Sequence, residues 1–178
     1  MGVLRHSFFA HKAPNVARAL LGQYLVRKRG KNVSRYIIIE TEAYDGFHDR
    51  ASHASRGKTP RNEVMFGKAG QWYVYFVYGM HEMLNIVCGD VGYPSAVLIR
   101  AVGGIVGPAR LTKALGITRA HNKKLASRAS GLWIERSGTR VPSRAIVRTP
   151  RVGVAYAGEW AHKKWRFILS DTKRRPKG

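Results

Sequence analysis

Two glutamates at the end of an apolar stretch are the residues of this sequence best suited to chemistry. The segment 36–44 reads YIIIETEAY and ends with Glu40, Glu42 and Tyr44 at alternate positions. β-Branched residues favour a buried strand, and successive side chains of a strand point to opposite faces. These three residues therefore share one face. The opposite face is expected to carry Ile37, Ile39, Thr41 and Ala43. Because carboxylates are rarely buried without a reason, the end of this strand predicts a site.

Glu42 is the candidate for a hydrolytic reaction, and Glu40 on the same face is the second choice. Glycosidic bonds break through oxocarbenium-like transition states. A carboxylate can activate the attacking water and stabilise the positive charge. The structural alternative is an ion pair between Glu42 and Arg50, Arg100 or another cation. The sequence alone leaves both interpretations open.

Four tyrosines could recognise a base, namely Tyr44, Tyr73, Tyr75 and Tyr78. Aromatic rings stack on an extruded base, and a base in a duplex must leave the stack before its sugar bond can be cut. Core packing is the favoured interpretation for Tyr73, and the two interpretations are balanced for Tyr75. Tyr78 precedes Gly79 at an expected hairpin tip, where it could wedge into the minor groove.

Three further residues have side chains that suit a nucleic-acid site. Arg100 interrupts an apolar strand, and a buried guanidinium needs an anion such as Glu42 or a phosphate. Asn85 is either a satisfied core amide or a reader of a base edge. His53 lies in the loop after Glu42, five residues from His48. That spacing matches no common zinc pattern, so we predict no metal site.

Nucleophilic catalysis by lysine is the rival mechanism. It would pass through a Schiff base between an amine and the sugar. The lysines fall in loops or polar runs, where burial would not lower their pKa; examples are Lys58, Lys68, Lys123 and Lys124. The sequence therefore gives no support for a lysine nucleophile.

The elements that must position these residues are mainly strands. A helix is expected over 13–21, after Pro14, and a second over 108–116. Strands are expected over 23–29, 34–42, 71–78, 82–87, 96–102, 133–136, 151–156 and 165–169. A long polar loop covers 45–62, and such loops are often functional. The pattern predicts an α+β fold, a single domain over 1–171 built on a curved antiparallel sheet with a few short helices and a protruding hairpin. The tail 172–178 is expected to be disordered.

Composition narrows the class of partner. Lys and Arg number 32 against 10 Asp and Glu, a formal charge of +22. That charge suits a polyanion, because cations that neutralise phosphates release counterions. A hydrophobic content of 44% argues against a purely basic scaffold protein. One cysteine, Cys88, excludes an internal disulfide and fits a reducing, intracellular compartment. No membrane span or signal peptide is evident.

Taken together, these segments resemble the alkyladenine (3-methyladenine) DNA glycosylase family. The matching blocks run in order along nearly the whole chain: LLGQYLV (20–26), ETEAYDG (40–46), RASHASRGKTPRN (50–62), MFGKAGQWYVYFVYGMHEMLNIV (65–87), VLIRAV (97–102), GPARLTKALGI (107–117), LWIERSG (132–138) and RVGVAYAGEW (151–160). The combination of ETEAY, TPRN, YVYFVYGM and RVGV is specific.

The resemblance implies roles for the residues that match. Glu42 would activate the attacking water, Arg100 would help hold that water and a phosphate, and the main chain at Val154 would face the water. The flipped base would lie between Tyr44 and His53 on one side and Tyr75 on the other, with Asn85 excluding normal guanine. The intercalating wedge would be Tyr78 with Met80.

The implied activity is that of a monofunctional DNA glycosylase that needs no cofactor or metal. It would act, as a monomer, on double-stranded DNA containing damaged purines such as 3-methyladenine, 7-methylguanine or hypoxanthine. The alternative is an inactive or RNA-directed basic binding protein. Three positions depart from the mammalian pattern: His81, Ala96 and Ala155. A methyl group at position 155 is expected to narrow the pocket against etheno adducts.

Overall fold

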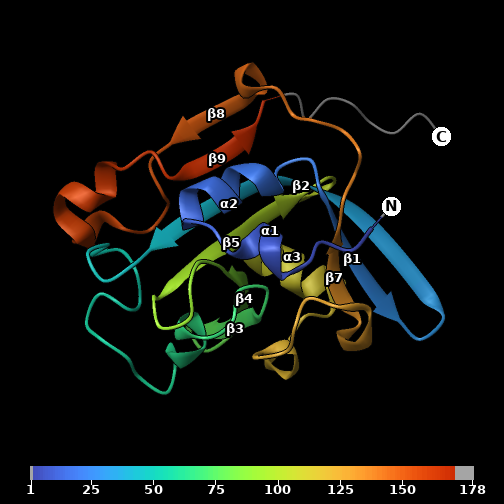
Figure 1. Cartoon of the computed structure of the whole chain (residues 1–178), viewed down its shortest axis with the longest axis horizontal. Helices are drawn as coiled ribbons and strands as arrows, with labels where there is room; N and C mark the ends of the chain where they lie inside the picture. Colours follow the sequence, from blue (N-terminus) through green and yellow to red (C-terminus); the bar gives the residue numbers. More distant parts are fainter. Residues whose placement is uncertain (1, 171–178) are drawn as a thin grey trace.

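One large antiparallel sheet dominates the computed structural model, which describes residues 2–170 (Figure 1). Its main path is β3-β4-β5-β2-β1-β7, with β6 beside β5 and β9 between β2 and β8. The strands are β1 (Tyr24–Arg29), β2 (Asn32–Asp45), β3 (Trp72–Val77), β4 (His81–Val87), β5 (Ser95–Val102), β6 (Ile105–Val106), β7 (Leu132–Glu135), β8 (Ile146–Thr149) and β9 (Arg166–Leu169). The sheet is not closed into a barrel, so the predicted α+β class with an antiparallel sheet is confirmed.

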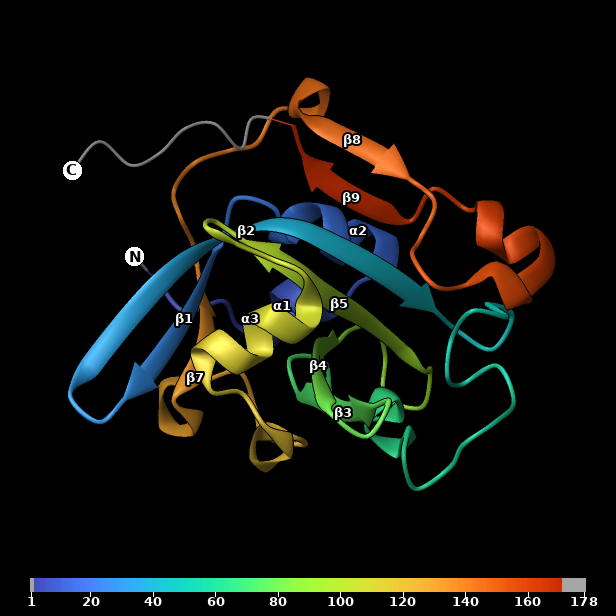
Figure 2. The same ribbon diagram turned by 180° about the vertical axis from the view of Figure 1, so that it is seen from behind.

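Helices in the described part of the chain are few and short. The α-helices are α1 (His6–Phe9), α2 (Ala13–Leu20) and α3 (Pro108–Leu115). The 3-10 helices are η1 (Glu63–Phe66), η2 (Arg119–His121), η3 (Arg128–Ser130), η4 (Ser143–Ala145) and η5 (Ala155–His162). In Figure 1 α1 and α2 cover the near side of the sheet, and in Figure 2 α3 lies on the side turned to the viewer. None of the helices in residues 2–170 is long and apolar enough to cross a membrane.

Strand β2 is the centre of the sheet and belongs to two parts of it. Its first half pairs with β1, and its second half pairs with β5 and β9. The register against β5 shifts between Ile38 and Thr41, which is the mark of a β-bulge. The bulge reverses the alternation of faces, so Ile38 is fully buried while Ile37 is 39% exposed. The predicted inward face was therefore wrong for Ile37.

Downstream of the bulge the predicted faces are correct. Ala43 is buried in the main core, and the Thr41 hydroxyl donates to the carbonyl of Ala17 in α2. Helix α2 lies on this face because its apolar residues recur at helical spacing: Ala13, Val16, Ala17 and Leu20. The opposite face of the same strand segment carries both glutamates.

The protruding hairpin predicted from the sequence is formed by β3 and β4. The strands pair up to Val77 and His81, and the N–H of Met80 donates to the carbonyl of Val77. Both Tyr78 and Gly79 have positive φ values, 52° and 67°. Helix α3 braces the second strand through a hydrogen bond from the Thr112 hydroxyl to the carbonyl of Glu82.

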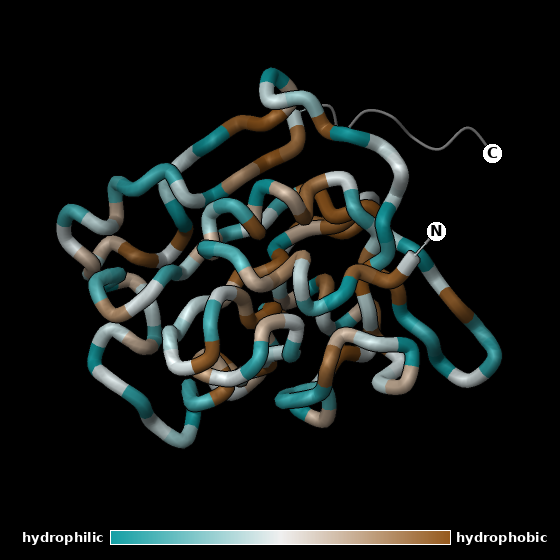
Figure 3. The backbone as a smooth tube through the Cα atoms, in the orientation of Figure 1, coloured by the Kyte–Doolittle hydropathy of each residue, from teal (hydrophilic) through white to brown (hydrophobic). Residues whose placement is uncertain are grey.

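Two further differences concern the C-terminal third. The predicted strand 151–156 is wrong, because Arg151 is drawn into the interior and Gly153 has a φ of 75°, after which the chain enters η5. The strand that pairs with β9 is instead β8. Figure 3 shows hydrophobic residues along the inner strands and hydrophilic ones on the outer loops. The predicted tail 172–178 lies outside the described residues.

Candidate active site

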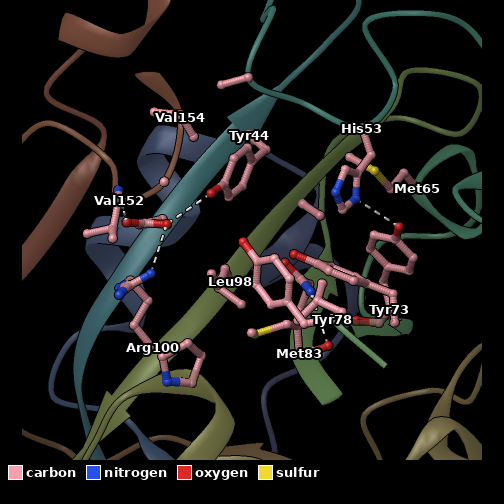
Figure 4. Close-up of a pocket in the computed structure, with 18 of the residues that line it drawn as sticks. Tyr44, His53, Met65, Tyr73, Tyr78, Met83, Leu98, Arg100, Val152 and Val154 are labelled. Carbon is pink, nitrogen blue, oxygen red and sulfur yellow. Dashed lines mark hydrogen bonds and ion pairs between the residues drawn. The ribbon is translucent and has the colours of Figure 1, made fainter. Parts of the chain in front are cut away.

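Glu42 is the centre of a set of converging hydrogen bonds. Its side chain is fully buried on β2. Oε1 accepts from the backbone N–H of Val152 at 2.8 Å, and Oε2 accepts from the hydroxyl of Tyr44 at 2.9 Å (Figure 4). The guanidinium of Arg100 lies 3.4 Å from Oε2. The carboxylate is thus fixed in one orientation, with its negative charge compensated.

The ion-pair alternative proposed from the sequence applies mainly to the other glutamate. Glu40 Oε1 accepts from Nε of Arg100 at 2.8 Å and from Nε of Arg166 at 2.7 Å. Burial lowers the pKa of Arg100, but Glu42 and Glu40 outweigh that effect and raise it above its ordinary value. Glu40 does not line the cavity described next. It anchors Arg100, which leaves Glu42 to face the cavity.

A cavity of about 260 Å³ opens beside Glu42 on the side of the sheet shown in Figure 4. Its size suits a single heterocyclic base better than a larger ligand, since pockets for drug-sized molecules start at roughly 300 Å³. The lining is aromatic and apolar with a few polar groups: Glu42, Tyr44, Ala51, His53, Met65, Tyr73, Tyr75, Val77, Tyr78, Met83, Asn85, Ala96, Leu98, Arg100, Pro108, Val152, Gly153, Val154 and Tyr156.

The residues predicted to hold a base do meet in this cavity. The rings of His53 and Tyr75 lie edge to face with centroids 4.6 Å apart. Nδ1 of His53 is 3.1 Å from the hydroxyl of Tyr73. Tyr73 is 1% exposed, as core packing predicted, yet its ring also borders the cavity. Tyr44 stands across the cavity from these rings, beside Glu42 (Figure 4). The pairing of His53 with Tyr44 that the resemblance implied is therefore wrong, because His53 packs against Tyr75.

The protonation states of these groups follow from burial. Burial, with a further contribution from Arg61, lowers the pKa of His53 to about 4, so its imidazole is neutral near pH 7. Burial and then the Glu42 carboxylate raise the pKa of Tyr44 well above its ordinary value. Burial likewise raises the pKa of Tyr75 to about 12. The tyrosines therefore remain neutral hydrogen-bond donors, and the wall opposite Glu42 carries no charge.

Asn85 combines the two interpretations that the sequence left open. Its amide nitrogen donates to the carbonyls of Tyr73 and Met83, at 3.2 and 3.3 Å, as a structural amide would. The residue is 2% exposed and still lines the cavity. Its position on β4 is fixed by pairing with Tyr73. A base entering the cavity would therefore meet a rigid amide.

The predicted wedge residues lie at the tip of the β3–β4 hairpin. Tyr78 is 88% exposed and Met80 is 68% exposed. Tyr78 also borders the cavity mouth, so the tip stands directly beside the place that a base would occupy. Large apolar side chains at a surface are informative when they gather next to a pocket.

Several residues of the site were not predicted from the sequence. The amide on Glu42 comes from Val152, whereas the prediction named the main chain at Val154, which also lines the cavity. Tyr156 stands at the rim, with its hydroxyl donating to the carbonyl of Ala51. Ala155 is exposed and outside the lining, so its methyl group does not narrow the cavity as expected. These contacts arise because the segment 151–156 turns towards the interior. Its alternating apolar residues predicted a strand instead, so the sequence contained no sign of them.

A buried ion pair behind the site was also missed. Arg151 and Asp49 have fully buried side chains joined by two contacts of 2.5 and 2.8 Å. Arg151 also donates to the carbonyl of Ala43, and its guanidinium lies 4.9 Å from the ring centroid of Tyr44. The pair ties the loop after β2 to the segment that presents Val152. In residues 2–170 no three His, Cys, Asp or Glu side chains gather as metal ligands would.

The site combines a buried carboxylate with an aromatic, base-sized cavity, and an exposed hairpin tip borders that cavity. On a protein with a charge of +22, this combination is typical of proteins that process the bases of nucleic acids. Comparison of the sequence with known protein families identifies the family within this class. The model of the methylpurine-DNA glycosylase family matches residues 7–106 and 102–173. The chain belongs to this family, which makes it a DNA glycosylase, a hydrolase of DNA repair.

Full-length relatives agree with the family model. One from Myxococcus xanthus is 48% identical over 189 residues, covering all of this chain and 95% of the relative. One from Anaeromyxobacter dehalogenans (strain 2CP-1) is 45% identical and covers 93% of this chain and 81% of the relative. One from Methanocella arvoryzae is 43% identical and covers 94% and 92%. All three carry the name "Putative 3-methyladenine DNA glycosylase".

Proposed function

We propose that this protein flips damaged purines out of duplex DNA and hydrolyses their N-glycosidic bond with a water activated by Glu42. The observation that carries the proposal is the geometry of Glu42, a fully buried carboxylate at the wall of the aromatic cavity. Tyr44 and the amide of Val152 hold it still. A carboxylate so placed can accept the proton of water and stabilise an oxocarbenium-like sugar.

The reaction balances without a cofactor. Water adds to the anomeric carbon, and the C–N bond breaks with its electron pair going to the base. A cationic lesion such as 7-methylguanine leaves as a neutral base, whereas hypoxanthine takes up one proton from solvent, to which Glu42 finally returns the proton that it receives. Glu42 receives the proton lost by water. The products are a free purine and an abasic site, and no residue forms a covalent bond to the sugar. Glu42 and Arg100 are the groups proposed to touch the reacting atoms, with Glu40 holding Arg100 in place.

Selectivity is proposed to come from the walls of the cavity. An electron-poor damaged purine is already a good leaving group, so a cavity that only stacks it can be tolerant, provided that normal bases are excluded. Tyr44 would lie against one side of the base, and His53 and Tyr75, whose ring centroids are 4.6 Å apart, would lie against the other. The rigid amide of Asn85 would crowd the exocyclic amine of guanine. Substrates in this proposal are 3-methyladenine, 7-methylguanine, hypoxanthine and ethenoadenine.

The exposed hairpin tip is proposed to hold the DNA open. Tyr78 would enter the minor groove and fill the gap that the flipped nucleotide leaves, with Met80 beside it. The exposure of both side chains and the position of Tyr78 at the cavity mouth support this role. The protein is proposed to act inside the cell, as a monomer, on double-stranded DNA.

The test is base release from duplexes containing one hypoxanthine, followed by alkaline cleavage of abasic sites. Glu42→Gln keeps the shape of the side chain but cannot take a proton, so we expect base release to vanish while binding to abasic-site DNA persists. Glu40→Gln is the matched control, because its carboxylate lies outside the cavity. It should keep measurable turnover. Release by Glu42→Gln at the rate of the unaltered protein would remove Glu42 from the mechanism.

A wild-type protein that binds the duplex without releasing any base would support the alternative of an inactive binding module. Tighter binding to duplex RNA than to duplex DNA at the same salt concentration would point to an RNA-directed protein. The same assay, run on both nucleic acids, separates these outcomes.

A further inference from the structure

A second hairpin projects from the body of the molecule, away from the proposed wedge. It is formed by β1 and β2, which pair with each other from Tyr24↔Ile37 to Arg29↔Asn32. On its other edge β1 pairs with β7 only as far as Arg27. Residues 28–33, here called the basic arm, therefore extend beyond the sheet as a two-stranded ribbon (Figures 1 and 2).

The basic arm carries positive charge that no neighbouring carboxylate balances. The sequence from 24 to 39 contains no Asp or Glu. Within it, Arg35 pairs with Glu135 at 2.9 Å. Arg27 donates only to backbone carbonyls, and Lys28, Arg29 and Lys31 have no carboxylate partner among the described residues. These last three side chains are exposed. A solvated surface normally mixes both signs of charge, so a one-sign ribbon indicates an anionic partner.

Helix α3 connects the arm to the cavity. Pro108 at its start lines the cavity. At its other end Arg27 donates to the carbonyls of Leu115 and Gly116, which fixes the base of the arm against the helix. Between them the helix exposes Arg110 and Lys113. Figure 2 shows α3 on the viewer's side, between the β1–β2 hairpin and β3–β4.

The length of this path suits a DNA strand. Eight helical residues rise about 12 Å, and successive phosphates of one strand advance about 3.4 Å along a duplex. The helix therefore spans roughly four base pairs from the cavity, and the arm begins where it ends. The exposed cations of α3, Arg110 and Lys113, therefore lie on a path whose length matches a few phosphates of one DNA strand.

We propose that the basic arm is a second DNA-binding element, which contacts the phosphates on one side of the damaged nucleotide about four or more base pairs away. The proposal rests on the proposed function for the position of the duplex. The exposed side chains of Lys28, Arg29 and Lys31 supply the contacts, while Arg27 holds the arm in place. The arm reads no sequence, since it offers only cations to phosphates.

The choice of DNA over an acidic protein follows from continuity. Helix α3 joins the arm to the cavity, because its first residue, Pro108, lines the cavity and its middle exposes Arg110 and Lys113. In Figure 2 this helix lies between the β1–β2 hairpin and β3–β4. The arm exposes little apolar surface beyond Val33, which is 42% exposed. Protein interfaces need an apolar centre, whereas phosphate contacts do not.

The experiment compares two triple variants that lose the same charge. The arm variant is Lys28→Ser, Arg29→Ser, Lys31→Ser. The control is Arg136→Ser, Arg140→Ser, Arg144→Ser, three exposed arginines along the segment that leaves β7. Binding is measured on an undamaged 25-base-pair duplex over a salt series. If two of the three side chains contact phosphates at a time, their loss lowers the slope of log K against log salt by about 1.8, which corresponds to roughly thirtyfold weaker binding near 0.15 M salt. We expect that loss for the arm variant and a small change for the control.

A hydroxyl-radical footprint locates the contact. On a duplex with one tetrahydrofuran abasic-site analogue, the arm variant should lose protection on one side of the analogue only. A charge-retaining variant, Lys28→Arg, Arg29→Lys, Lys31→Arg, should restore both readouts. Equal losses in the arm variant and the control, or protection lost evenly on both sides, would overturn the proposal. Neither readout uses base release, so a protein that excises nothing refutes the proposed function and leaves this test intact.

Discussion

At the scale of single residues, the hydroxyl of Tyr44 is the group most closely coupled to Glu42. Its raised pKa keeps it protonated, so it donates to Oε2 over the whole working pH range. Tyr44→Phe removes only this donor and keeps the ring. A lost hydrogen bond to a buried charge costs roughly 1.5–3 kcal/mol, which corresponds to about ten- to a hundredfold in rate if it acts in the transition state.

We therefore expect Tyr44→Phe to slow single-turnover release of hypoxanthine by at least tenfold while affinity for abasic-site DNA stays within about threefold. Quench-flow on saturated duplex measures the first quantity and titration measures the second. An unchanged rate would mean that the Tyr44 hydroxyl has no part in positioning the carboxylate.

His53 makes a testable contribution to the pH dependence of stability. Its pKa of about 4 in the folded state lies below the ordinary value of about 6.5. Between pH 6.5 and pH 4 the His53 imidazole is protonated in the unfolded chain but not in the folded protein. The free energy of unfolding therefore falls as the pH drops through this range. One edge of the residue is exposed, and solvent screens the penalty, so we expect on the order of 1 kcal/mol.

Urea unfolding at pH 7 and pH 4.5 checks this expectation. Between the two pH values, the free energy of unfolding should fall more for the wild-type protein than for His53→Gln. The rate of base release should depend on pH near 6.5 in the same way for both proteins, because His53 does not titrate there in the folded state. Identical losses in the two proteins would contradict a depressed pKa for His53.

The period of two along a strand predicted that Glu42 and Tyr44 share a face, and both line the cavity. The choice of Tyr75 depended on the family resemblance, because the residues alone left core packing equally open. The amide of Val152 could not be found in this way. It depends on a backbone turn, and any residue type can supply an N–H. Glu40 was the second choice on the same face, and the structure separates the two glutamates by their partners. Arg100 and Arg166 donate to Glu40, whereas Tyr44 and the amide of Val152 donate to Glu42.

At the scale of elements, the buried pair Asp49–Arg151 joins the loop after β2 to the segment before η5. Removing one partner leaves an unpaired buried charge, which costs roughly 3–5 kcal/mol. Replacing both by apolar residues avoids that charge. We expect Arg151→Met to destabilise by at least about 3 kcal/mol, and Asp49→Leu with Arg151→Met to destabilise by clearly less than the two single changes added together.

The double-mutant cycle, measured by urea unfolding, gives the coupling directly. Base release provides a second readout, because the pair holds the ring of Tyr44 and presents the amide of Val152. The double variant should therefore fold and still lose rate. Additive destabilisation would show that the two side chains do not act as a pair.

The backbone conformation at the hairpin tip lowers the stability of the fold but keeps the side chain of Tyr78 exposed. Tyr78 has a φ of 52°, a left-handed conformation that costs a residue with a Cβ roughly 1–2 kcal/mol. Glycine adopts it freely. Tyr78→Gly should therefore keep or slightly raise the melting temperature, and should weaken binding to lesion DNA at least tenfold relative to undamaged DNA. A lower melting temperature would show that the turn is not strained, and equal losses on both DNAs would argue against a wedge.

The sequence predicted most of the strands and the two longer α-helices, α2 and α3, but not α1, the 3-10 helices or the irregularities of the strands. Apolar runs with turn residues between them gave β1 to β5, and proline with a following glycine gave α3. The bulge in β2 left no local signal, since it depends on pairing with β5. The segment 151–156 has alternating apolar residues like a strand, but tertiary burial of Arg151 overrides that pattern.

At the scale of the whole molecule, the charge of +22 is expected to act on the binding of the duplex and not on the cleavage of the glycosidic bond. Phosphate contacts act through counterion release, so they set how strongly the duplex is held, whereas the cavity opposite Glu42 is uncharged and base-sized. Salt should therefore change the encounter and leave the bond-breaking step alone. This separation follows because the cations of the arm and α3 are exposed to the duplex, whereas Arg100, which lines the cavity, is paired with Glu40 and Glu42.

We accordingly expect the second-order rate for hypoxanthine release from a duplex to fall by about a thousandfold between 50 and 200 mM salt, if roughly six phosphates are contacted. The single-turnover rate at saturating protein should stay within about twofold over the same range. Hypoxanthine deoxyriboside has no phosphate, so any slow hydrolysis of it should not depend on salt. A saturated rate that falls in parallel with the second-order rate would mean that the phosphate contacts are still forming in the transition state, and that binding and chemistry are coupled through the charged surface.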